Sequence, residues 1–357
     1  MVRIVVVMAL FILTLNCKHS VEPPPNNGPD TTSHNFTWEY DTLAYPRSDQ
    51  TLIESLWGSS ENDVYAVGHN DRGLGTIWHW DGDTWKSLVN YEGPIDPYYL
   101  RGGSYYQVYG TSKEDVWVVG SNVRGTYPDF IRQELILHYN GYEWIKKEFD
   151  GDGAISVWGI SADDVWFGTI DSELIHFDGD NWTVLKLGFK AQINSIAGLS
   201  TDEVYATASG WGNQAPDDSS FNYFLKYDGF DWKVLDDYLY TGDKSTIKFG
   251  GSLWSDLKTQ KIYSSGYHIY LWINEEWITI SNIARGYING SSENNMFTIN
   301  WWGSVYHYNG KTWKKLSQLP KLDFSSVWCN DKYVFISAYI FDNVQKSVTI
   351  RGKQKEN

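Results

Sequence analysis

The amino-acid sequence predicts an all-β protein, specifically a seven-bladed β-propeller built from four-stranded antiparallel blades. The main observation is a unit of about 45 residues that recurs along residues 36–353, a period typical of propeller blades. The second is that short segments of alternating apolar residues end at turn dipeptides, whereas no long apolar stripe has helical spacing. The third is an isolated strand-like segment before the first complete unit.

The shortest complete copy of the unit covers residues 155–187 and contains four expected strands. Its Trp, Val, Ile and Phe residues suit a pleated, half-buried surface. Asp178-Gly179 tolerates the positive φ angles of a tight hairpin turn between the third and fourth strands. The expected strands are residues 156–159, 164–168, 173–177 and 182–187.

Three positions of the unit repeat along the chain. In the first strand, an aromatic residue usually precedes a small one, as in Trp57-Gly58 and Trp158-Gly159. The second strand carries an aliphatic–aromatic pair seven times: Val64-Tyr65, Val116-Trp117, Val165-Trp166, Val204-Tyr205, Ile262-Tyr263, Met296-Phe297 and Val334-Phe335. The fourth strand begins with Trp in six units: Trp85, Trp144, Trp182, Trp232, Trp277 and Trp313.

The missing seventh fourth-strand Trp is found at the other end of the chain. Trp38 lies in residues 36–42, which look like a fourth strand without the other three, whereas the last unit ends after its third strand near residues 347–351. We therefore expect the N-terminal strand to complete the last blade. Such closure of the ring leaves only short, protected sheet edges.

The repeat resembles bacterial β-propeller repeats of the form WGSSxxDVWAVG…IxHYDGxxW, which are related to Kelch-type, BNR-type and photosystem-assembly-factor-like propellers. Here it stands as LWGSSENDVYAVG with IWHWDGDTW, and as VYGTSKEDVWVVG with ILHYNGYEW. The regular double glycine of Kelch blades and the D-x-G spacing of sialidase Asp boxes are absent from the sequence. The resemblance implies the fold, and propellers support many different functions.

The N-terminal residues predict an address in the bacterial cell envelope. Residues 1–16 contain one Arg and then an apolar run, which is too short for a membrane span and is typical of a signal peptide. Cys17 follows directly, so we expect a lipoprotein anchored by a lipid on Cys17, in the outer membrane and facing the periplasm or the cell surface. Residues 17–35 form a Pro- and Asn-rich tether. The propeller is expected over residues 36–353, with a short tail at 354–357.

The composition excludes one class of partner. The chain has 29 Lys and Arg against 44 Asp and Glu, a formal net charge of −15. Such a protein repels nucleic acid and acidic lipid headgroups. The 19 Trp and 25 Tyr residues fall mostly at repeated blade positions, where packing accounts for them.

The sequence shows no catalytic constellation, and we expect neither a cofactor nor a metal. His79, His138, His176 and His307 all lie six residues before a fourth-strand Trp. A position repeated around a ring is a scaffold position, so these side chains are interpreted as structural. Cys329 fills a small first-strand position and is expected to be a buried thiol without a disulfide partner.

The non-repeated segments are where function is expected, because variable loops on a rigid scaffold carry most sites. The long segments 89–106, 121–134, 207–223 and 236–251 are expected on one face of the ring. Their aromatic and basic residues suit a sugar or a peptide, although they can equally serve only to pin the loops to the blades. The candidate ligand-binding residues are Tyr98, Tyr99, Arg101, Tyr127, Arg132, Trp211, Tyr238 and Tyr240.

Two functions of different classes follow from these observations. The first is a monomeric, non-catalytic, lipid-anchored module that recognises a protein or a glycan, as in assembly or carbohydrate binding. The alternative is a carbohydrate-active enzyme, such as a glycoside hydrolase, lyase or glycosyl transferase, on the same face. A hydrolase would need two carboxylates roughly 5–10 Å apart. The candidate acids are Asp96, Asp129, Asp217 and Asp218.

Overall fold

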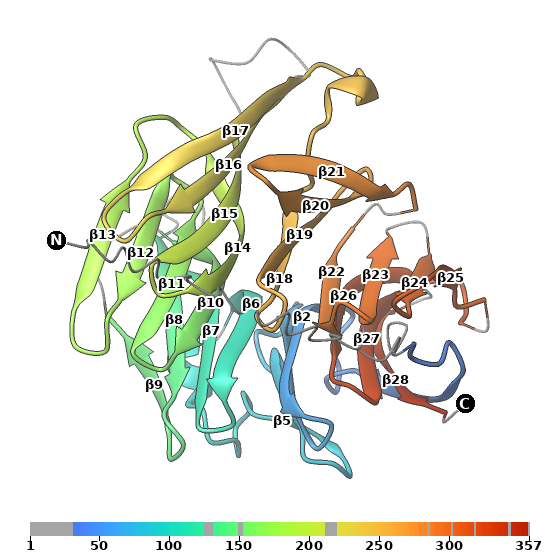
Figure 1. Ribbon diagram of the computed structural model, residues 1–357. Coiled ribbons are helices and arrows are strands. Elements are labelled where there is room, and N and C mark those ends of the chain that lie inside the picture. The colour runs from blue at the N-terminus through green and yellow to red at the C-terminus, as the bar shows by residue number, and fades with distance from the viewer. Residues whose placement is uncertain are drawn as a thin grey trace, which may run out of the picture.

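The strands form a closed ring of antiparallel sheets (Figure 1). The structure is a computed structural model, and it describes residues 31–100, 102–124, 131–148, 153–210, 220–283, 286–300, 303–317, 319–341 and 344–355. Over these residues, 28 strands make seven four-stranded sheets, which confirms the predicted propeller. One helical turn, α1 (Pro97–Leu100), and one 3-10 turn, η1 (Lys244–Thr246), lie in the connections. Neither of these described turns is long and apolar enough to cross a membrane.

Six blades are consecutive in the chain, with the first strand of each on the inside of the ring. Blades 1 to 3 are β2 (Thr51–Ser60), β3 (Asp63–Asn70), β4 (Ile77–Trp80) and β5 (Trp85–Ser87); β6 (Gly103–Ser112), β7 (Asp115–Arg124), β8 (Ile131–Tyr139) and β9 (Trp144–Lys147); and β10 (Ala154–Ser161), β11 (Asp164–Thr169), β12 (Glu173–Phe177) and β13 (Trp182–Lys186). Blades 4 to 6 are β14 (Gln192–Ser200), β15 (Glu203–Gly210), β16 (Ser220–Tyr227) and β17 (Trp232–Tyr240); β18 (Ser252–Asp256), β19 (Lys261–Ser265), β20 (Ile269–Ile273) and β21 (Glu276–Ser281); and β22 (Ile288–Ser292), β23 (Asn295–Asn300), β24 (Ser304–Tyr308) and β25 (Trp313–Lys315).

The seventh blade joins the two ends of the chain, as predicted. It contains β26 (Asp323–Cys329), β27 (Tyr333–Phe341) and β28 (Gln345–Gln354), and β1 (Phe36–Leu43) is its outer strand. The β1–β28 ladder runs from Phe36 opposite Gln354 to Leu43 opposite Ser347. Trp38 lies opposite Gly352, where a Cβ atom would be 2.5 Å from the indole. The missing side chain of Gly352 therefore makes room for the closing Trp.

The aromatic–small pairs of the first strands pack several blades against the next. At four junctions, the ring at the inner aromatic position, which is the first residue of the pair, covers the small residue of the following blade, so that a larger side chain would clash. A Cβ atom added to the small residue would lie 2.6 Å from Trp57 at Gly110, 2.3 Å from Trp158 at Gly198, 2.8 Å from Trp254 at Gly290 and 3.0 Å from Trp328 at Gly58. This contact explains why the second position of the repeated pair is small.

A belt of hydrogen bonds also joins neighbouring blades around the channel. In each case, a side chain two residues before the inner aromatic position accepts from a backbone N–H of the next blade. The bonds run from Val108 N to Ser55 Oγ (3.3 Å), Val157 N to Gln107 Oε1 (2.9 Å), Leu253 N to Ser195 Oγ (3.0 Å), Ile288 N to Ser252 Oγ (3.3 Å) and Leu56 N to Ser326 Oγ (3.0 Å). The last of these bonds joins blade 7 to blade 1.

The repeated histidines lie on third strands and contact groups of their own blades. The His138 Nε2 atom is 2.7 Å from Asp115 Oδ1, and its ring stacks on Trp117 with centroids 3.8 Å apart. Burial alone would raise the pKa of Asp115, but hydrogen bonds from His138, Thr111 and Trp117 lower it. Among the described residues, no group of three or more His, Cys, Asp or Glu side chains could hold a metal ion. Cys329 is buried in the first strand of blade 7, and burial raises the pKa of its thiol.

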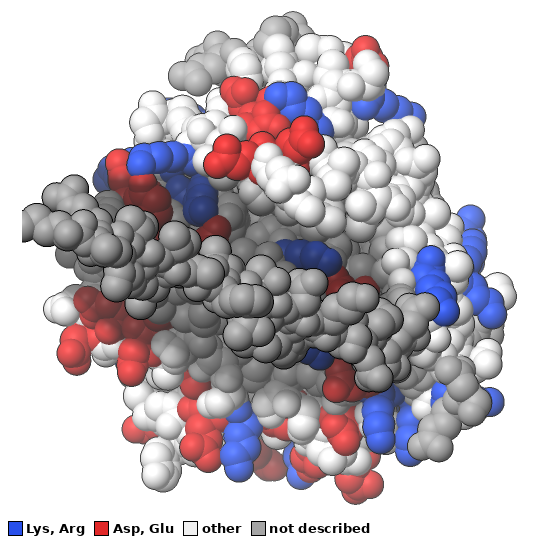
Figure 2. Space-filling view, in the orientation of Figure 1, with Lys and Arg blue, Asp and Glu red and all other residues white. Residues whose placement is uncertain are grey.

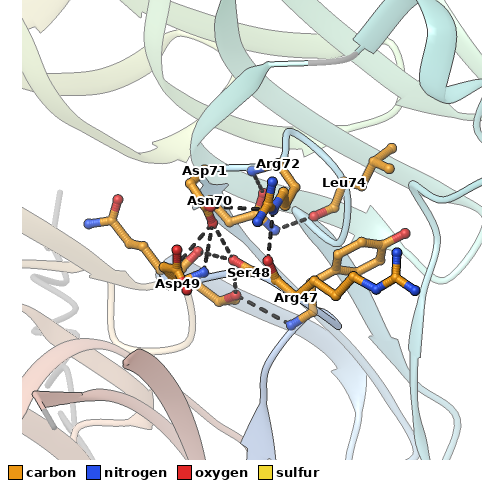
Figure 3. Close-up of polar contacts among 10 residues, drawn as sticks. Arg47, Ser48, Asp49, Asn70, Asp71, Arg72 and Leu74 are labelled. Carbon is orange, nitrogen blue, oxygen red and sulfur yellow. Dashed lines mark hydrogen bonds and ion pairs between the residues drawn. The ribbon is translucent and has the colours of Figure 1, made fainter. Parts of the chain in front are cut away.

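A polar cluster holds the link between β1 and β2 against the β3–β4 loop (Figure 3). Asp71 Oδ1 accepts from Ser48 Oγ at 2.5 Å and from the backbone N–H groups of Asp49 and Gln50 at 3.1 and 3.3 Å. Arg72 Nε donates to the carbonyl of Arg47 at 2.7 Å. Burial tends to raise the pKa of Asp71, but the Ser48 and Gln50 donors lower it. This cluster fixes the chain where it passes from the last blade to the first.

Candidate functional site

A cavity of about 1040 Å³ occupies the centre of the ring. Every innermost strand contributes to its walls: β2, β6, β10, β14, β18, β22 and β26. Figure 2 shows a face of the molecule with a hollow near its centre and both basic and acidic side chains beside it. The cavity is of the size that binds small molecules or short chain segments.

A repeated β-bulge turns one residue of the inner strand toward the channel. In several described inner strands, the register with the second strand shifts by one residue, three positions before the inner aromatic position. A bulged residue is unpaired in the ladder and its side chain is re-aimed. The bulged residues all line the cavity: Glu54, Tyr106, Ile155, Asn194 and Ser325.

The mouth of the cavity lies on the face that carries the links between blades. The inner strands begin on this face, and so their bulges are near it. The β17–β18 link supplies Lys244, and β17 ends at Tyr240; both side chains line the cavity. The ammonium group of Lys244 is 5.2 Å from the centre of the Tyr267 ring, which also lines the cavity. We call this region the channel mouth.

Glu54 is held at the channel mouth by two neighbours. His69 Nδ1 lies 3.5 Å from Glu54 Oε1, and the Tyr339 hydroxyl is near enough for the Glu54 charge to act on it. Burial, followed by the charge of Glu54, raises the pKa of Tyr339. Of the cavity-lining residues in the described ranges, Glu54 is the one carboxylate and Lys244 the one ammonium.

Amide side chains line the wall formed by blade 4. Gln192 Nε2 donates to Asn194 Oδ1 at 2.9 Å, and Asn194 Nδ2 donates to Ser209 Oγ at 3.1 Å. Gln192 and Asn194 line a cavity that also contains tyrosine rings. The channel mouth therefore combines amide groups, aromatic rings and one charge of each sign.

The structure separates the residues that the sequence singled out. Tyr240 lines the cavity. Tyr238 instead donates its hydroxyl to the Phe249 carbonyl at 3.1 Å and packs on the Phe249 ring, so it pins the β17–β18 link. Tyr98, in α1, is 81% exposed and is not among the cavity-lining residues. The backbone of Tyr99 lies in α1 and that of Arg132 in β8, and their side chains are outside the described part, as are Cys17, Arg101, Tyr127 and Trp211.

Several cavity residues were not predicted from the sequence, above all Glu54, Gln192, Asn194 and Lys244. For Glu54 and Asn194, the bulge position gives the missing signal. Three residues before the inner aromatic position, the chain has Glu54, Tyr106, Ile155, Asn194, Gly251, Gly286 and Ser325. These residues differ from blade to blade in a strand that otherwise repeats. Variation at a repeated position that faces a channel indicates a site.

Comparison with known proteins shows the fold. The chain matches no family model and no curated protein. It is similar to the structure of YCF48 bound to D1 peptide, with a TM-score of 0.62, 13% identity, and coverage of 91% of this chain and 100% of that one. For YCF48 from Cyanidioschyzon merolae, the TM-score is 0.53 at 13% identity, and the match covers 89% of this chain and 99% of that one. For the WD40 beta propeller domain of Doa1, the TM-score is 0.54 at 14% identity, and the match covers 90% of this chain and 98% of that one.

A fourth similar structure is the extracellular domain of the putative one component system BT4673 from B. thetaiotaomicron. Its TM-score is 0.56 at 13% identity, and the match covers 87% of this chain and 39% of that one. At such identities, the likeness concerns the fold and not the ligand. The chain is a seven-bladed β-propeller whose structural neighbours come from otherwise different proteins.

Proposed function

We propose that this protein is a non-catalytic binding module that holds an extended segment of a partner protein in the channel mouth, while a lipid on Cys17 anchors it in the bacterial cell envelope. The observation that carries the binding role is the open cavity of about 1040 Å³ with amide, tyrosine and charged groups in its walls. Rigid inner strands present these groups, so binding requires little ordering of the protein.

The chemistry of the walls supports a polypeptide as the ligand. The side-chain amides of Gln192 and Asn194 offer donors and acceptors that match those of a peptide backbone. Tyrosine rings give apolar contact area and keep a polar hydroxyl, a combination suited to peptide chains. One similar propeller is known in complex with a peptide, the D1 peptide of the YCF48 structure. Glycans share part of this chemistry, so they form the second arm of the test.

The cavity walls do not favour the enzymatic alternative. A glycoside hydrolase uses two carboxylates on opposite sides of the scissile bond. Within the described cavity lining, Glu54 has no second carboxylate beside it. Asp96 accepts from the Tyr98 backbone N–H at 2.8 Å at the start of α1, and Asp129, Asp217 and Asp218 lie outside the described residues.

A cavity-filling substitution tests the binding role. Gly251 lines the channel mouth, and a Cβ atom there would meet no atom within 4 Å. Gly251→Trp should therefore fill the mouth without disturbing the fold. Gly188 has the same open surroundings but does not line the cavity, so Gly188→Trp is the matched control.

The full chain and both variants would be presented to a displayed library of random peptides and to a glycan array. We expect peptides that bind the wild type and Gly188→Trp equally and bind Gly251→Trp weaker by about tenfold or more. Ligands that bind all three proteins equally would refute the channel mouth as the site. Glycans that show the Gly251 dependence in place of peptides would replace the polypeptide with a sugar.

The proposed address rests on the leader and on Cys17. Cys17→Ala, or treatment with globomycin, should leave an unprocessed or unanchored protein. Normal processing and membrane retention of the Cys17→Ala protein would refute the lipid anchor. This outcome is independent of ligand binding, which the propeller provides.

A further inference from the structure

The charge of the channel mouth is unevenly distributed. Glu54 is the bulged residue of β2 in blade 1, whereas Lys244 belongs to η1 between blades 4 and 5. Blade 1 and the blade 4–5 link lie on different sides of the ring. Elsewhere on the described walls, the lining side chains are neutral. The two charges therefore act on different parts of any bound segment.

The Glu54 carboxylate is positioned by its neighbours and retains capacity for a ligand. Its side chain is 35% exposed, His69 Nδ1 is 3.5 Å from Oε1, and the Tyr339 hydroxyl is near enough for the carboxylate charge to act on it. A carboxylate has about four lone-pair sites, so these two neighbours leave room for a further donor. A cationic donor would form a charge-assisted hydrogen bond, which is stronger than a neutral one.

Aromatic surface is available in the same cavity as this carboxylate. Tyr287 is 45% exposed, lines the cavity, and is close enough for the Glu54 charge to act on its hydroxyl. A Lys or Arg side chain that reaches Glu54 can place its apolar stem, or its charged group, against such a ring. Neutral or acidic side chains would gain no comparable contact.

The charge of the whole protein acts in the same direction. With a formal net charge of −15, the chain attracts cationic segments and repels acidic ones before contact is made. Lys244 is exposed on the other side of the mouth and lies over Tyr267, so it does not neutralise Glu54 directly. Long-range attraction and local geometry therefore favour the same class of ligand group.

We propose that Glu54 is the specificity-determining residue of the channel mouth and that it binds a Lys or Arg side chain of the partner segment. This inference rests on the proposed function, because it names the chemistry that the same cavity selects. Blade 1 supplies the acceptor, and Tyr287 supplies aromatic surface for the stem in the same cavity.

The probes are three peptides, acetyl-Gly-Gly-X-Gly-Gly-amide, in which X is lysine, norleucine or glutamate. Their affinities for the full chain would be measured by saturation-transfer NMR at low and high salt. We expect the lysine peptide to bind about tenfold more tightly than the norleucine peptide, and the glutamate peptide to bind most weakly. High salt should reduce the preference for lysine.

The matched variants are Glu54→Gln and Glu143→Gln, which change the net charge equally. Glu143 is exposed in the β8–β9 turn, away from the cavity. Glu54→Gln should bring the lysine peptide to the norleucine level, whereas Glu143→Gln should keep the preference. The proposal is overturned if both variants behave alike, if lysine and norleucine bind equally to the wild type, or if the lysine peptide gives no signal.

Failure of this inference is distinguishable from failure of the binding role. If Gly251→Trp still weakens peptide binding while the lysine preference is absent, the cavity binds a segment but Glu54 does not select it. If Gly251→Trp has no effect on any peptide, the channel mouth is not the site, and both proposals fall.

Discussion

Removal of β1 should open the ring, because this strand supplies the fourth strand of blade 7 from the other end of the chain. Deletion of residues 18–30 ends before the first described residue and should leave the thermal midpoint almost unchanged. Deletion of residues 18–44 removes β1 and exposes the edge of β28. The protein should then melt at a lower temperature and show a stronger tendency to associate through that edge.

Two point variants set the magnitude. Phe36 is 8% exposed, and its ring centre lies 5.7 Å from that of Phe297 and 5.3 Å from that of Trp38. Phe36→Ala should cost about 3–5 kcal/mol, the usual range for a buried aromatic side chain. Trp38 is only half-buried, so Trp38→Ala should cost roughly half as much, about 2 kcal/mol. For a chain of this size, each kcal/mol lowers the midpoint by about 2 °C or slightly less.

The assay is a thermal melt of both truncations and both point variants, followed by circular dichroism. A synthetic peptide with the sequence of residues 31–44 should restore part of the stability when it is added to the longer truncation. Equal midpoints for the two truncations would refute closure by β1. If the peptide leaves the thermal midpoint of the longer truncation unchanged, β1 contributes nothing specific to blade 7.

Three further predictions concern the scaffold. Gly198→Ala should destabilise the protein by about 1–3 kcal/mol, because its Cβ atom would overlap the Trp158 ring, and equal denaturation midpoints for Gly198→Ala and Gly188→Ala would contradict this packing. Burial, and then the charge of His34, lowers the pKa of His307 to about 3, so stability present above pH 6.5 should fall toward pH 3 by up to about 1.4 kcal/mol per pH unit. Denaturant titrations at pH 7.5 and 5 measure this loss of stability. His307→Gln should reduce the loss, and an unchanged loss in this variant would refute the role of His307. In the same titrations, Asp71→Asn should lower the free energy of unfolding by on the order of 1 kcal/mol, a modest loss because Asp71 is partly exposed. An unchanged free energy of unfolding would mean that the cluster of Figure 3 does not stabilise the ring.

The fold could be predicted from the sequence because its determinants are local and repeated. Alternating apolar residues define a strand, and an Asp-Gly or Asn-Gly pair shortly before a fourth-strand Trp marks the hairpin turn between the third and fourth strands. The β10–β13 strands begin and end within two residues of the expected bounds. Closure was predictable from Trp38 because one Trp was missing from an otherwise regular series, and β1 indeed pairs with β28.

The site was less predictable because it depends on a register shift. If β2 paired regularly with β3, the Glu54 side chain would point to one face of the sheet. The bulge instead turns it toward the channel. The loop aromatics were informative only in part, because neighbouring aromatic residues have different environments. Tyr238 and Tyr240 are two residues apart on β17, yet one holds the link to Phe249 and the other lines the cavity. Sequence does not distinguish these environments.

After the contacts of Thr32 and His34 with blade 6, the closing strand is the first strand on which a mechanical load from the N-terminal side acts. A pull on residue 35, directed away from blade 7, reaches the ladder at the Phe36–Gln354 pair and peels it one pair at a time. Arg351 resists in the middle, because it binds Glu39 at 2.8 Å and Asp41 at 2.9 Å across the same ladder. Once those ion pairs part, β1 leaves the edge of β28 and blade 7 loses its outer strand. A load on β1 therefore acts on the closure of the ring itself.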